Sequence, residues 1–309
     1  MKRIRIGIVG LGKIALEEHV PALLANRAYE LVASASVGRK LDGALSYSSI
    51  DEMLDECPAL DAVSICTPPQ SHHMAAKAAL LRGKHVLLEK PPCATTDEFD
   101  ELVALASRNK CTLFQSWHTR ESTGVDVAAG WLAGRDFRRG RVVWKEDVRQ
   151  WHPGQEWIWR ENGFGVLDAG INAISILTKI IPDSISVEHA HLLVPANCAS
   201  PIAATAVFRT GRGALIEAEF DFRDRRALAR SIELETDAGT LRLVGHGETS
   251  VTPDSIVNLG SQHREYEALY RRFALLIGKR ESDTDKRPLQ LVLDILSQAR
   301  RTIVTPFEH

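Results

Sequence analysis

An acid and a base stand side by side in the segment HVLLEKPPC (residues 85–93), where Glu89 and Lys90 end an apolar run and two prolines follow. The run is typical of a buried strand, which a proline cannot continue. A lysine that is partly removed from water has a lowered pKa and can polarise a substrate hydroxyl or relay its proton. Glu89 is suited to holding Lys90 in place. The alternative is a structural ion pair at the end of a strand.

A second pair of polar residues lies in the segment LDAGIN, where Asp168 and Asn172 are four positions apart at the start of an apolar stretch. This spacing places both side chains on one face of a helix. An amide cannot take up a proton. Of this pair, only Asp168 could therefore take part in proton transfer.

The segment GLGKIA (residues 10–15) predicts a dinucleotide site, because its small residues follow a strand and begin a helix. The first glycine permits the tight turn, the second lets a pyrophosphate approach the backbone, and the helix N-terminus faces the phosphates. The alternative is a glycine-rich turn that binds nothing. The site residues expected in this turn are Gly10, Gly12, Lys13 and Ile14.

The end of the second predicted strand bears on the choice between NAD and NADP. A site for NAD alone usually has an acid there, but this chain has Ser36, Arg39 and Lys40, with no acid before Asp42. A hydroxyl and two cations suit a 2′-phosphate, so we predict that NADP is accepted alongside NAD. The alternative is a solvated loop.

Alternating strands and helices are needed to position these residues. Continuously apolar strands separated by helices predict a parallel sheet covered on both faces, hence an N-terminal Rossmann dinucleotide-binding domain over residues 1–118. Strands are predicted at 3–10, 29–36, 61–67, 84–89 and 111–116. Helices are predicted at 13–25, after a capping box of Ser49 and Glu52, at 71–83, and at 97–110 with Thr96 as the N-cap.

From residue 119 to residue 309 the pattern predicts an α+β domain with a large, mainly antiparallel sheet that has one open face. Helices are expected at 122–133 and around 164–180, and closing helices at 263–278 and 288–303. Strands are expected at 186–194, 203–210, 213–222, 230–239 and 240–245. The alternating apolar residues of 203–220 are expected to supply the open face.

Composition excludes several classes of partner. The net charge is −2 with no block of like charges, which argues against nucleic acid or a membrane surface. No run approaches the ~20 apolar residues of a membrane span, and no signal peptide is recognisable. Five scattered cysteines without a Cys-x-x-Cys pair indicate reduced thiols and a cytoplasmic protein: Cys57, Cys66, Cys93, Cys111 and Cys198. No metal site is expected, because no set of ligands has the required spacing.

The stretch TPPQSHHMAAKAALLRGKHVLLEKP (residues 67–91) resembles the glucose–fructose oxidoreductase/inositol dehydrogenase (Gfo/Idh/MocA) family, whose members carry T-P-x-x-x-H, A-L-x-x-G-K-H-V and E-K-P in this order. The resemblance implies a nicotinamide-dependent oxidoreductase with Lys90 at its catalytic centre. It also implies a homo-oligomer, a dimer or tetramer, that buries the open sheet face. Where the family has a histidine as acid/base, this chain has Asn172. Either the chain has lost catalysis, or Lys90 and Asp168 carry the proton while Asn172 orients a substrate oxygen. The cofactor residues that the resemblance adds are Thr67, Pro68, His72, Glu89 and Lys90.

The segments WKEDVRQWHPGQEWIW and GVLDAGINAISI resemble one branch of that family, bacterial aldose 1-dehydrogenases for L-arabinose and D-galactose, which also carry the asparagine. The resemblance implies oxidation of C1 of an aldopyranose to the lactone, with D-galactose first, then L-arabinose and D-fucose. Tryptophans with polar neighbours suit a pyranose. We expect Trp144 and Trp157 to pack in the core. The expected substrate residues are His118, Glu146, Trp151, His152, Asp168 and Asn172.

Three alternatives remain open. The basic segment RDRRALARS (residues 223–231) would suit a sugar acid or phosphate if Arg225, Arg226 or Arg230 reached the pocket; we favour a solvated hairpin loop. A reductase or dihydrodiol dehydrogenase of the same family is the second alternative. The third is a catalytically silent, nucleotide-sensing protein that binds a partner, which the replacement of the usual histidine by Asn172 favours.

Overall fold

The computed structural model describes residues 3–224, 229–258 and 265–308, and it divides into two compact units. Unit 1 is formed by Met1–His118 and His263–Lys286, and unit 2 by Thr119–Gln262 and Arg287–His309. The predicted second domain over 119–309 is therefore not one continuous body. Helix α8 (Glu265–Lys279) belongs to unit 1, because its apolar side is buried there. The sequence shows that α8 is amphipathic but not which core it completes.

In the described part of unit 1 the sheet has six strands, all parallel, in the order β3-β2-β1-β4-β5-β6. The predicted strands are confirmed, and the short β3 was not predicted. Every residue of β4 is buried, as are the last four of β1 and the last three of β5, which explains the continuous apolar runs. The strands are β1 (Ile4–Val9), β2 (Tyr29–Ala35), β3 (Leu45–Tyr47), β4 (Ala62–Ile65), β5 (His85–Leu88) and β6 (Leu113–Gln115).

Helices connect these strands, and one predicted cap is corrected. The N-cap of α4 is Thr95, not Thr96: Thr95 is extended and accepts a hydrogen bond from the Glu98 backbone, while Glu98 reaches back to the Thr95 amide. The Ser49 cap of α2 is confirmed. The helical elements are the π-helical turn η1 (Ala15–His19), α1 (Val20–Ala25), α2 (Ile50–Glu56), η2 (Pro69–Ser71), α3 (His72–Leu81), α4 (Thr96–Arg108) and the short turn η3 (His118–Glu121).

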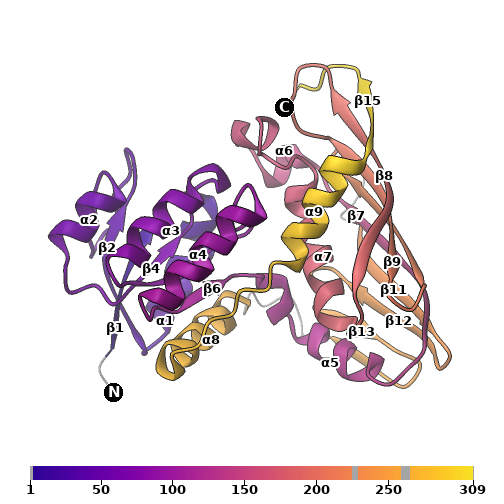
Figure 1. The fold of residues 1–309 in the computed structure, drawn as a ribbon, viewed down its shortest axis with the longest axis horizontal. Coiled ribbons are helices and arrows are strands. Elements are labelled where there is room, and N and C mark those ends of the chain that lie inside the picture. The colour runs from indigo at the N-terminus through magenta and orange to yellow at the C-terminus, as the bar shows by residue number, and fades with distance from the viewer. Residues whose placement is uncertain (1–2, 225–228, 259–264, 309) are drawn as a thin grey trace. The chain divides into compact units, whose positions relative to one another are not determined.

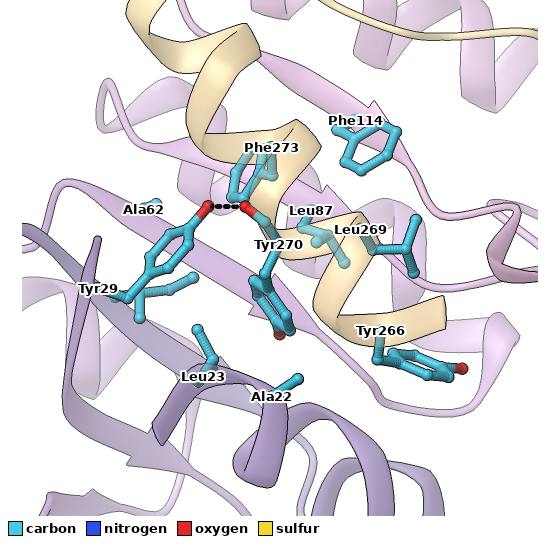
Figure 2. Packing of buried hydrophobic residues seen from close by; sticks show 11 residues of the cluster. Ala22, Leu23, Tyr29, Ala62, Leu87, Phe114, Tyr266, Leu269, Tyr270 and Phe273 are labelled. Carbon is cyan, nitrogen blue, oxygen red and sulfur yellow. Dashed lines mark hydrogen bonds between the residues drawn. The ribbon is translucent and has the colours of Figure 1, made fainter. Parts of the chain in front are cut away.

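Helix α8 closes the core of unit 1. Its rings Tyr270 and Phe273 are fully buried against Tyr29 of β2, and Phe273 stacks on Phe114 of β6 at 6.1 Å (Figure 2). The Tyr29 hydroxyl donates a hydrogen bond to the Tyr270 carbonyl at 2.8 Å. A segment distant in sequence thus becomes part of the nucleotide-binding fold.

Unit 2 has, over its described residues, a mixed sheet of nine strands in the order β14-β13-β12-β11-β7-β10-β9-β8-β15. Pairs β7–β10 and β8–β15 are parallel and the others antiparallel. The predicted mainly antiparallel sheet is confirmed. The strands are β7 (Phe137–Lys145), β8 (Ile185–Pro195), β9 (Ala203–Thr210), β10 (Leu215–Asp221), β11 (Ala229–Thr236), β12 (Gly239–Val244), β13 (Thr249–Val251), β14 (Ile256–Asn258) and β15 (Arg300–Val304).

Three helices of unit 2, α5, α7 and α9, lie on the same side of this sheet (Figure 1). The predicted helix over 288–303 is wrong in its last turn: α9 ends at Gln298, and Arg300–Val304 extends the sheet as β15, where Thr302 and Ile303 favour a strand. The helical elements are α5 (Thr123–Leu132), α6 (Val148–Trp151), the turn η4 (Glu156–Trp159), α7 (Leu167–Ile180) and α9 (Arg287–Gln298). Among the helices of the described chain, none combines the length and apolar character that crossing a bilayer requires.

The prediction that the alternating apolar residues of 203–220 form the open face is wrong. Ala206, Phe208 and Phe220 are buried on the side of the helices, where Gly170 of α7 packs directly on the Phe220 ring. Successive side chains of a strand point to opposite faces, so the other set faces outward. That outward set is mainly polar: Thr205, Val207, Arg209, Glu217 and Glu219.

Candidate active site

The fingerprint turn after β1 has the geometry that a dinucleotide needs. Gly10 has a φ of +88°, and a Cβ on it would lie 2.8 Å from the Thr67 backbone nitrogen, so only glycine fits. A Cβ at Gly12 would meet nothing within 4 Å, which leaves its backbone open to a ligand. The two glycines therefore fit the roles predicted from the sequence.

A cavity of about 820 Å³ opens beside this turn, within the size range of nucleotide sites. Exposed apolar side chains that sequence reasoning missed, Val37, Met74 and Leu81, also line it and suit the flat face of a base. Of the predicted cofactor residues, its lining includes Gly10, Gly12, Ser36, Arg39, Thr67 and Pro68. Among the described residues, those predicted for the cofactor but outside the lining are Lys13, Ile14, His72, Glu89 and Lys90.

The residues after β2 hold the fingerprint turn. Ser36 accepts a hydrogen bond from the Leu11 amide at 3.3 Å, and Arg39 donates one to the Leu11 carbonyl at 2.9 Å. Asp51, an acid at the cavity rim, is paired with Arg82 at 3.1 Å. The charge of Arg39 is therefore not matched by a carboxylate in these contacts, whereas the charge of Asp51 is matched by Arg82.

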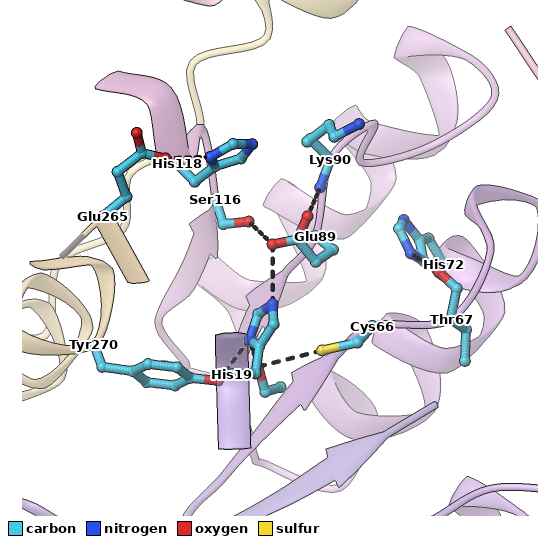
Figure 3. A network of polar contacts seen from close by, with 11 residues as sticks. His19, Cys66, Thr67, His72, Glu89, Lys90, Ser116, His118, Glu265 and Tyr270 are labelled. Atoms are coloured by element: carbon cyan, nitrogen blue, oxygen red, sulfur yellow. Dashed lines mark hydrogen bonds and ion pairs between the residues drawn. The ribbon is translucent and has the colours of Figure 1, made fainter. Parts of the chain in front are cut away.

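Lys90 follows β5 at the carboxyl edge of the parallel sheet. Glu89 holds it through the backbone, because its Oε2 accepts the Lys90 N–H at 3.0 Å, while the Lys90 ammonium points away from Glu89 (Figure 3). His72 contacts the carbonyls of Pro91 at 2.8 Å and Thr67 at 2.6 Å. Burial lowers the pKa of His72, which these carbonyls partly offset. His72 therefore braces the segment that carries Lys90.

His118 is the last residue of the first segment of unit 1. Its Nδ1 lies 2.6 Å from a carboxylate oxygen of Glu265, and its ring stacks on Tyr266 at 5.3 Å. Both partners come from α8. The side chain is buried, so α8 determines the orientation of this predicted substrate residue.

Asp168 and Asn172 lie in the first two turns of α7, as the spacing predicts. Both are buried, at 2% and 9% exposure. A carboxylate in the first turn of a helix is stabilised by the helix dipole. The Asn172 carbonyl accepts hydrogen bonds from Thr119 at 3.3 Å and Ser175 at 2.8 Å, which fixes this turn of α7.

Glu146 follows β7 and lies in a cluster of charged and aromatic side chains within unit 2. Both Nε and Nη2 of Arg230 donate to its Oε2, at 3.2 and 2.5 Å, and His152 Nε2 lies 3.5 Å from its Oε1. The Arg230 guanidinium lies 5.1 Å from the centroid of Trp151 and 5.5 Å from that of Trp144. Asp147 caps α6, which places Trp151 and His152 beside Glu146.

The charge of Glu146 is stabilised despite burial. Burial alone would raise the pKa of this carboxyl, but the hydrogen bond with His152 and the charge of Arg230 lower it to about 2. The expectation of a solvated loop is therefore wrong for Arg230, whose side chain is only 11% exposed. Arg225 and Arg226 lie outside the described residues. Trp144 is buried, in agreement with its predicted packing role.

Unit 1 has a nucleotide-sized cavity at the edge of a parallel sheet, and unit 2 has a cluster of charged and aromatic side chains around Glu146. Such a combination is typical of a nucleotide-dependent oxidoreductase. Residues 4–116 match the oxidoreductase family with an NAD-binding Rossmann fold, Gfo/Idh/MocA. Over 307 residues the chain is 42% identical to galactose 1-dehydrogenase from Pseudomonas fluorescens, covering 99% of both proteins. The chain belongs to the Gfo/Idh/MocA oxidoreductase family, which confirms the resemblance, and its cofactor class is the nicotinamide dinucleotides.

Solved structures agree with this assignment. D-galactose-1-dehydrogenase from Rhizobium etli has a TM-score of 0.94 and 42% identity, covering 100% of this chain and 99% of that one. The 3-ketoreductase KijD10 from Actinomadura kijaniata, solved with NADP and TDP-benzene, has a TM-score of 0.85 at 20% identity, covering 98% of this chain and 100% of that one. At that identity the likeness concerns the fold.

Proposed function

We propose that this protein is an NAD(P)-dependent aldose 1-dehydrogenase that oxidises C1 of D-galactose to the lactone, and L-arabinose and D-fucose as well. The observation that carries the proposal is the 42% identity to galactose 1-dehydrogenases along nearly the whole chain. The aligned length extends over both units, so the likeness is not confined to the nucleotide fold.

In the proposed reaction Lys90 takes or relays the proton of the C1 hydroxyl. The bound dinucleotide, held by the turn at Gly10 and Gly12, supplies the hydride acceptor. Loss of the C1 hydride and of the hydroxyl proton converts the hemiacetal into a lactone, so atoms and charge balance. Asp168 hydrogen-bonds the same region and tunes Lys90, and Asn172 orients the anomeric or ring oxygen.

The cluster around Glu146 supports a neutral sugar over a sugar acid or phosphate. The charge of Arg230 is already matched by Glu146 at 2.5 Å, so an anionic substrate would have to compete with a buried carboxylate. An ionised Glu146 accepts sugar hydroxyls, and the Trp151 ring suits the C–H face of a pyranose. His118 and His152 complete the proposed set of hydroxyl partners.

We propose that NADP is accepted alongside NAD. Arg39 lines the nucleotide cavity and donates only to a neutral carbonyl, and the acid at the rim, Asp51, is paired with Arg82. A 2′-phosphate would therefore meet a guanidinium without a competing carboxylate.

We propose a cytoplasmic location. The five cysteines of the chain are free thiols, which suits a reducing compartment.

We also propose a homo-oligomer that buries the open face of the unit 2 sheet. Acids and bases alternate there: Glu217 is opposite Arg141 in the register of β10 and β7, and Lys145 pairs with Glu219 at 2.5 Å. A groove of about 630 Å³ follows the same strands. A two-fold interface uses the same patch on both copies, so a patch that carries both acids and bases is suited to pairing with itself. Sedimentation as a monomer would contradict this proposal, and the Arg141→Glu change should favour dissociation.

The test of the main proposal is reduction of NADP and NAD, followed by absorbance, against aldoses, sugar acids and polyols at mildly alkaline pH. We expect turnover with D-galactose, L-arabinose and D-fucose and little with D-glucose, which differs from galactose at one hydroxyl. Turnover with a carbonyl substrate or dihydrodiol instead would favour the reductase. Tight nucleotide binding without turnover of any compound would favour the sensor.

A further inference from the structure

A cluster of polar side chains that includes Glu89 lies buried in unit 1 next to the backbone of Lys90, and the proposed reaction assigns it no step (Figure 3). At its centre is His19, in the π-helical turn that follows the fingerprint glycines. His19 is 0% exposed and Glu89 4% exposed. Single-turn π-helices are frequent at functional sites. We define this group as the His19 cluster: His19, Ser64, Glu89, Ser116 and Tyr270.

Both nitrogens of the His19 ring are occupied. Its Nε2 lies 3.1 Å from Oε1 of Glu89, and its Nδ1 lies 2.7 Å from the Tyr270 hydroxyl and 3.3 Å from that of Ser64. Oε1 of Glu89 also accepts a hydrogen bond from Ser116 at 2.8 Å. The carboxylate therefore has partners on both oxygens, because Oε2 accepts the Lys90 N–H.

The electrostatics of the cluster require two opposite charges. Burial alone would raise the pKa of Glu89, but the hydrogen bond and charge of His19, with the charge of His118, lower it to about 2. Burial alone would lower the pKa of His19; the Cys66 thiol, the Tyr270 hydroxyl and Glu89 together raise it well above its usual value. A buried carboxylate without a counter-charge is strongly unfavourable, so an imidazolium is the form that matches it.

The titratable groups that face His19 come from three elements. Glu89 follows β5, Cys66 follows β4, and Tyr266 and Tyr270 lie on α8, with the Tyr266 ring centroid 4.7 Å from that of His19. His118 acts on Glu89. Glu89 is the carboxylate among these groups, so it is the negative charge that a protonated His19 neutralises.

The cluster fixes the backbone on one side of Lys90, and His72 fixes it on the other. Glu89 holds the Lys90 N–H, and His72 contacts the Pro91 carbonyl at 2.8 Å. A lysine side chain has four rotatable bonds, so the position of its ammonium depends first on its backbone. A displacement of ~1 Å in a catalytic group can cost about 100-fold in rate.

We propose that His19 is a positioning residue: as the imidazolium partner of Glu89 it holds that carboxylate on the Lys90 amide and thereby sets the position of the reacting lysine. The inference rests on the proposed role of Lys90 in proton transfer. Helix α8 is part of the device, because Tyr270 accepts the second proton of the ring. The return of the chain to unit 1 after residue 262 therefore serves the reaction as well as the core.

The test uses three variants of the cluster: His19→Gln, Glu89→Gln, and the double variant that carries both changes. Each is compared with a control variant, Tyr29→Phe. Gln can still donate one hydrogen bond but carries no charge. Tyr29→Phe removes a buried hydroxyl from the same core, whose bond is to the Tyr270 carbonyl, outside the cluster. It is therefore a control for loss of stability alone.

For His19→Gln we expect kcat with galactose to fall by about 100-fold while the Kd for NADPH changes little. Without its counter-charge Glu89 should protonate at a higher pH, so the kcat profile of this variant should gain an acid limb that the wild type lacks. The double variant should lose no more than the worse single variant, because it buries no charge. Tyr29→Phe should lower the melting temperature and leave kcat and its pH profile unchanged.

Amide hydrogen exchange gives a readout that does not depend on the substrate. The Lys90 amide should exchange about tenfold faster or more in His19→Gln than in the wild type, and at the wild-type rate in Tyr29→Phe. Unchanged exchange at Lys90, or an unchanged kcat profile in an active enzyme, would overturn the inference. If the wild type turned over no sugar while Lys90 exchange responded as expected, the proposed function would fail and the positioning would stand.

Discussion

Among the residues that the structure describes, each unit buries one ionised glutamate directly after a strand, and the two are held in different ways. Glu89 follows β5 in unit 1 and is paired with a histidine, two serines being part of its network. Glu146 follows β7 in unit 2 and is paired with Arg230 between two tryptophan rings. Both carboxyls have a pKa of about 2.

The difference lies in the partner. An arginine stays protonated at any pH that a protein survives, whereas a histidine can lose its proton. Glu146 therefore keeps its counter-charge under all working conditions, which suits a surface that binds sugar hydroxyls. Glu89 depends on His19, whose charge can be lost by titration. Because Glu89 also accepts a hydrogen bond from the Lys90 backbone, this arrangement suits a residue that positions Lys90.

The largest effect that separates the two carboxylates is expected from Lys90→Ala. Loss of the proton acceptor should lower kcat by a factor of about 1,000 or more, with NADPH binding retained. If the Glu89 pair acts through Lys90, adding His19→Gln to Lys90→Ala should cost no further turnover. Adding Glu146→Gln should still weaken galactose binding.

Steady-state kinetics and galactose protection against thermal unfolding measure these two responses. A further loss of kcat on adding His19→Gln would mean that His19 acts by another route. Retained turnover in Lys90→Ala would remove the lysine from the mechanism and with it the contrast between the two glutamates.

The next largest effect is expected from breaking the unit 2 pair. Arg230→Met leaves Glu146 buried without its permanent partner, which should reduce the free energy of unfolding by about 3–5 kcal/mol. The double variant with Glu146→Gln should recover much of that stability but not galactose binding. Urea unfolding followed by tryptophan fluorescence is suitable, because five of the six tryptophans are in unit 2.

The matched control for this prediction is the exposed pair of Arg139 and Glu235 on the same sheet, at 2.7 Å. Arg139→Met should change stability by less than ~1 kcal/mol. Equal effects of the two arginine variants would show that burial of the Glu146 pair has no energetic consequence.

The pH dependence should differ between the units. Because the pKa of Glu146 is lowered from 4.5 to about 2, its stabilisation is complete above about pH 4.5 and is lost as the pH falls toward 2, a change on the order of 3 kcal/mol. Glu89 behaves alike. Since the pKa of His19 is raised, its contribution is complete below the usual 6.5 and is lost as the pH rises through the folded value.

Unit 1 should therefore weaken at both ends of the pH range, and the Glu146 cluster at the acid end only. Hydrogen exchange, corrected for its intrinsic pH dependence, should show protection in residues 15–25 and 85–90 falling between neutral and strongly alkaline pH, while residues 229–236 stay protected. Alkaline loss in the β11 segment would remove the distinction between the two pairs.

Local patterns made the elements and the motif residues predictable. The turn after β1, the placement of Asp168 and Asn172 on one helix and the apolar strands are predictable, because each depends on residues close in sequence. The cap of α4 was misplaced by one residue, since two threonines are adjacent and only the backbone decides between them. The end of the last helix is mispredicted for a similar reason. Residues 300–304 contain strand-favouring side chains, but whether they form a strand depends on the neighbouring strand β8, which is distant in sequence.

The partners of the two buried glutamates were not predictable by such means. His19 looks like an ordinary histidine on an apolar helix, and Tyr270 like a core residue of α8. Their meeting depends on α8 returning to unit 1, which no local pattern encodes. Arg230 lies in a basic segment whose spacing suggests solvent, and its pairing with Glu146 depends on the register between β11 and β7.

The smallest effect is expected at Arg39. It tests whether an arginine binds an anionic group only when no carboxylate is already paired with it. Arg230 is neutralised by Glu146, whereas Arg39 at the nucleotide cavity donates to the Leu11 carbonyl. If that contrast holds, Arg39→Ala should raise the KM for NADP by about 10- to 100-fold, the worth of one or two charge-assisted hydrogen bonds, and change the KM for NAD little. Lys40→Ala, which removes the neighbouring cation, is the control and should have a smaller effect. An equal loss with NAD and NADP would mean that Arg39 serves only to hold the fingerprint turn, and it would leave Ser36 and Lys40 as the predicted partners of the 2′-phosphate.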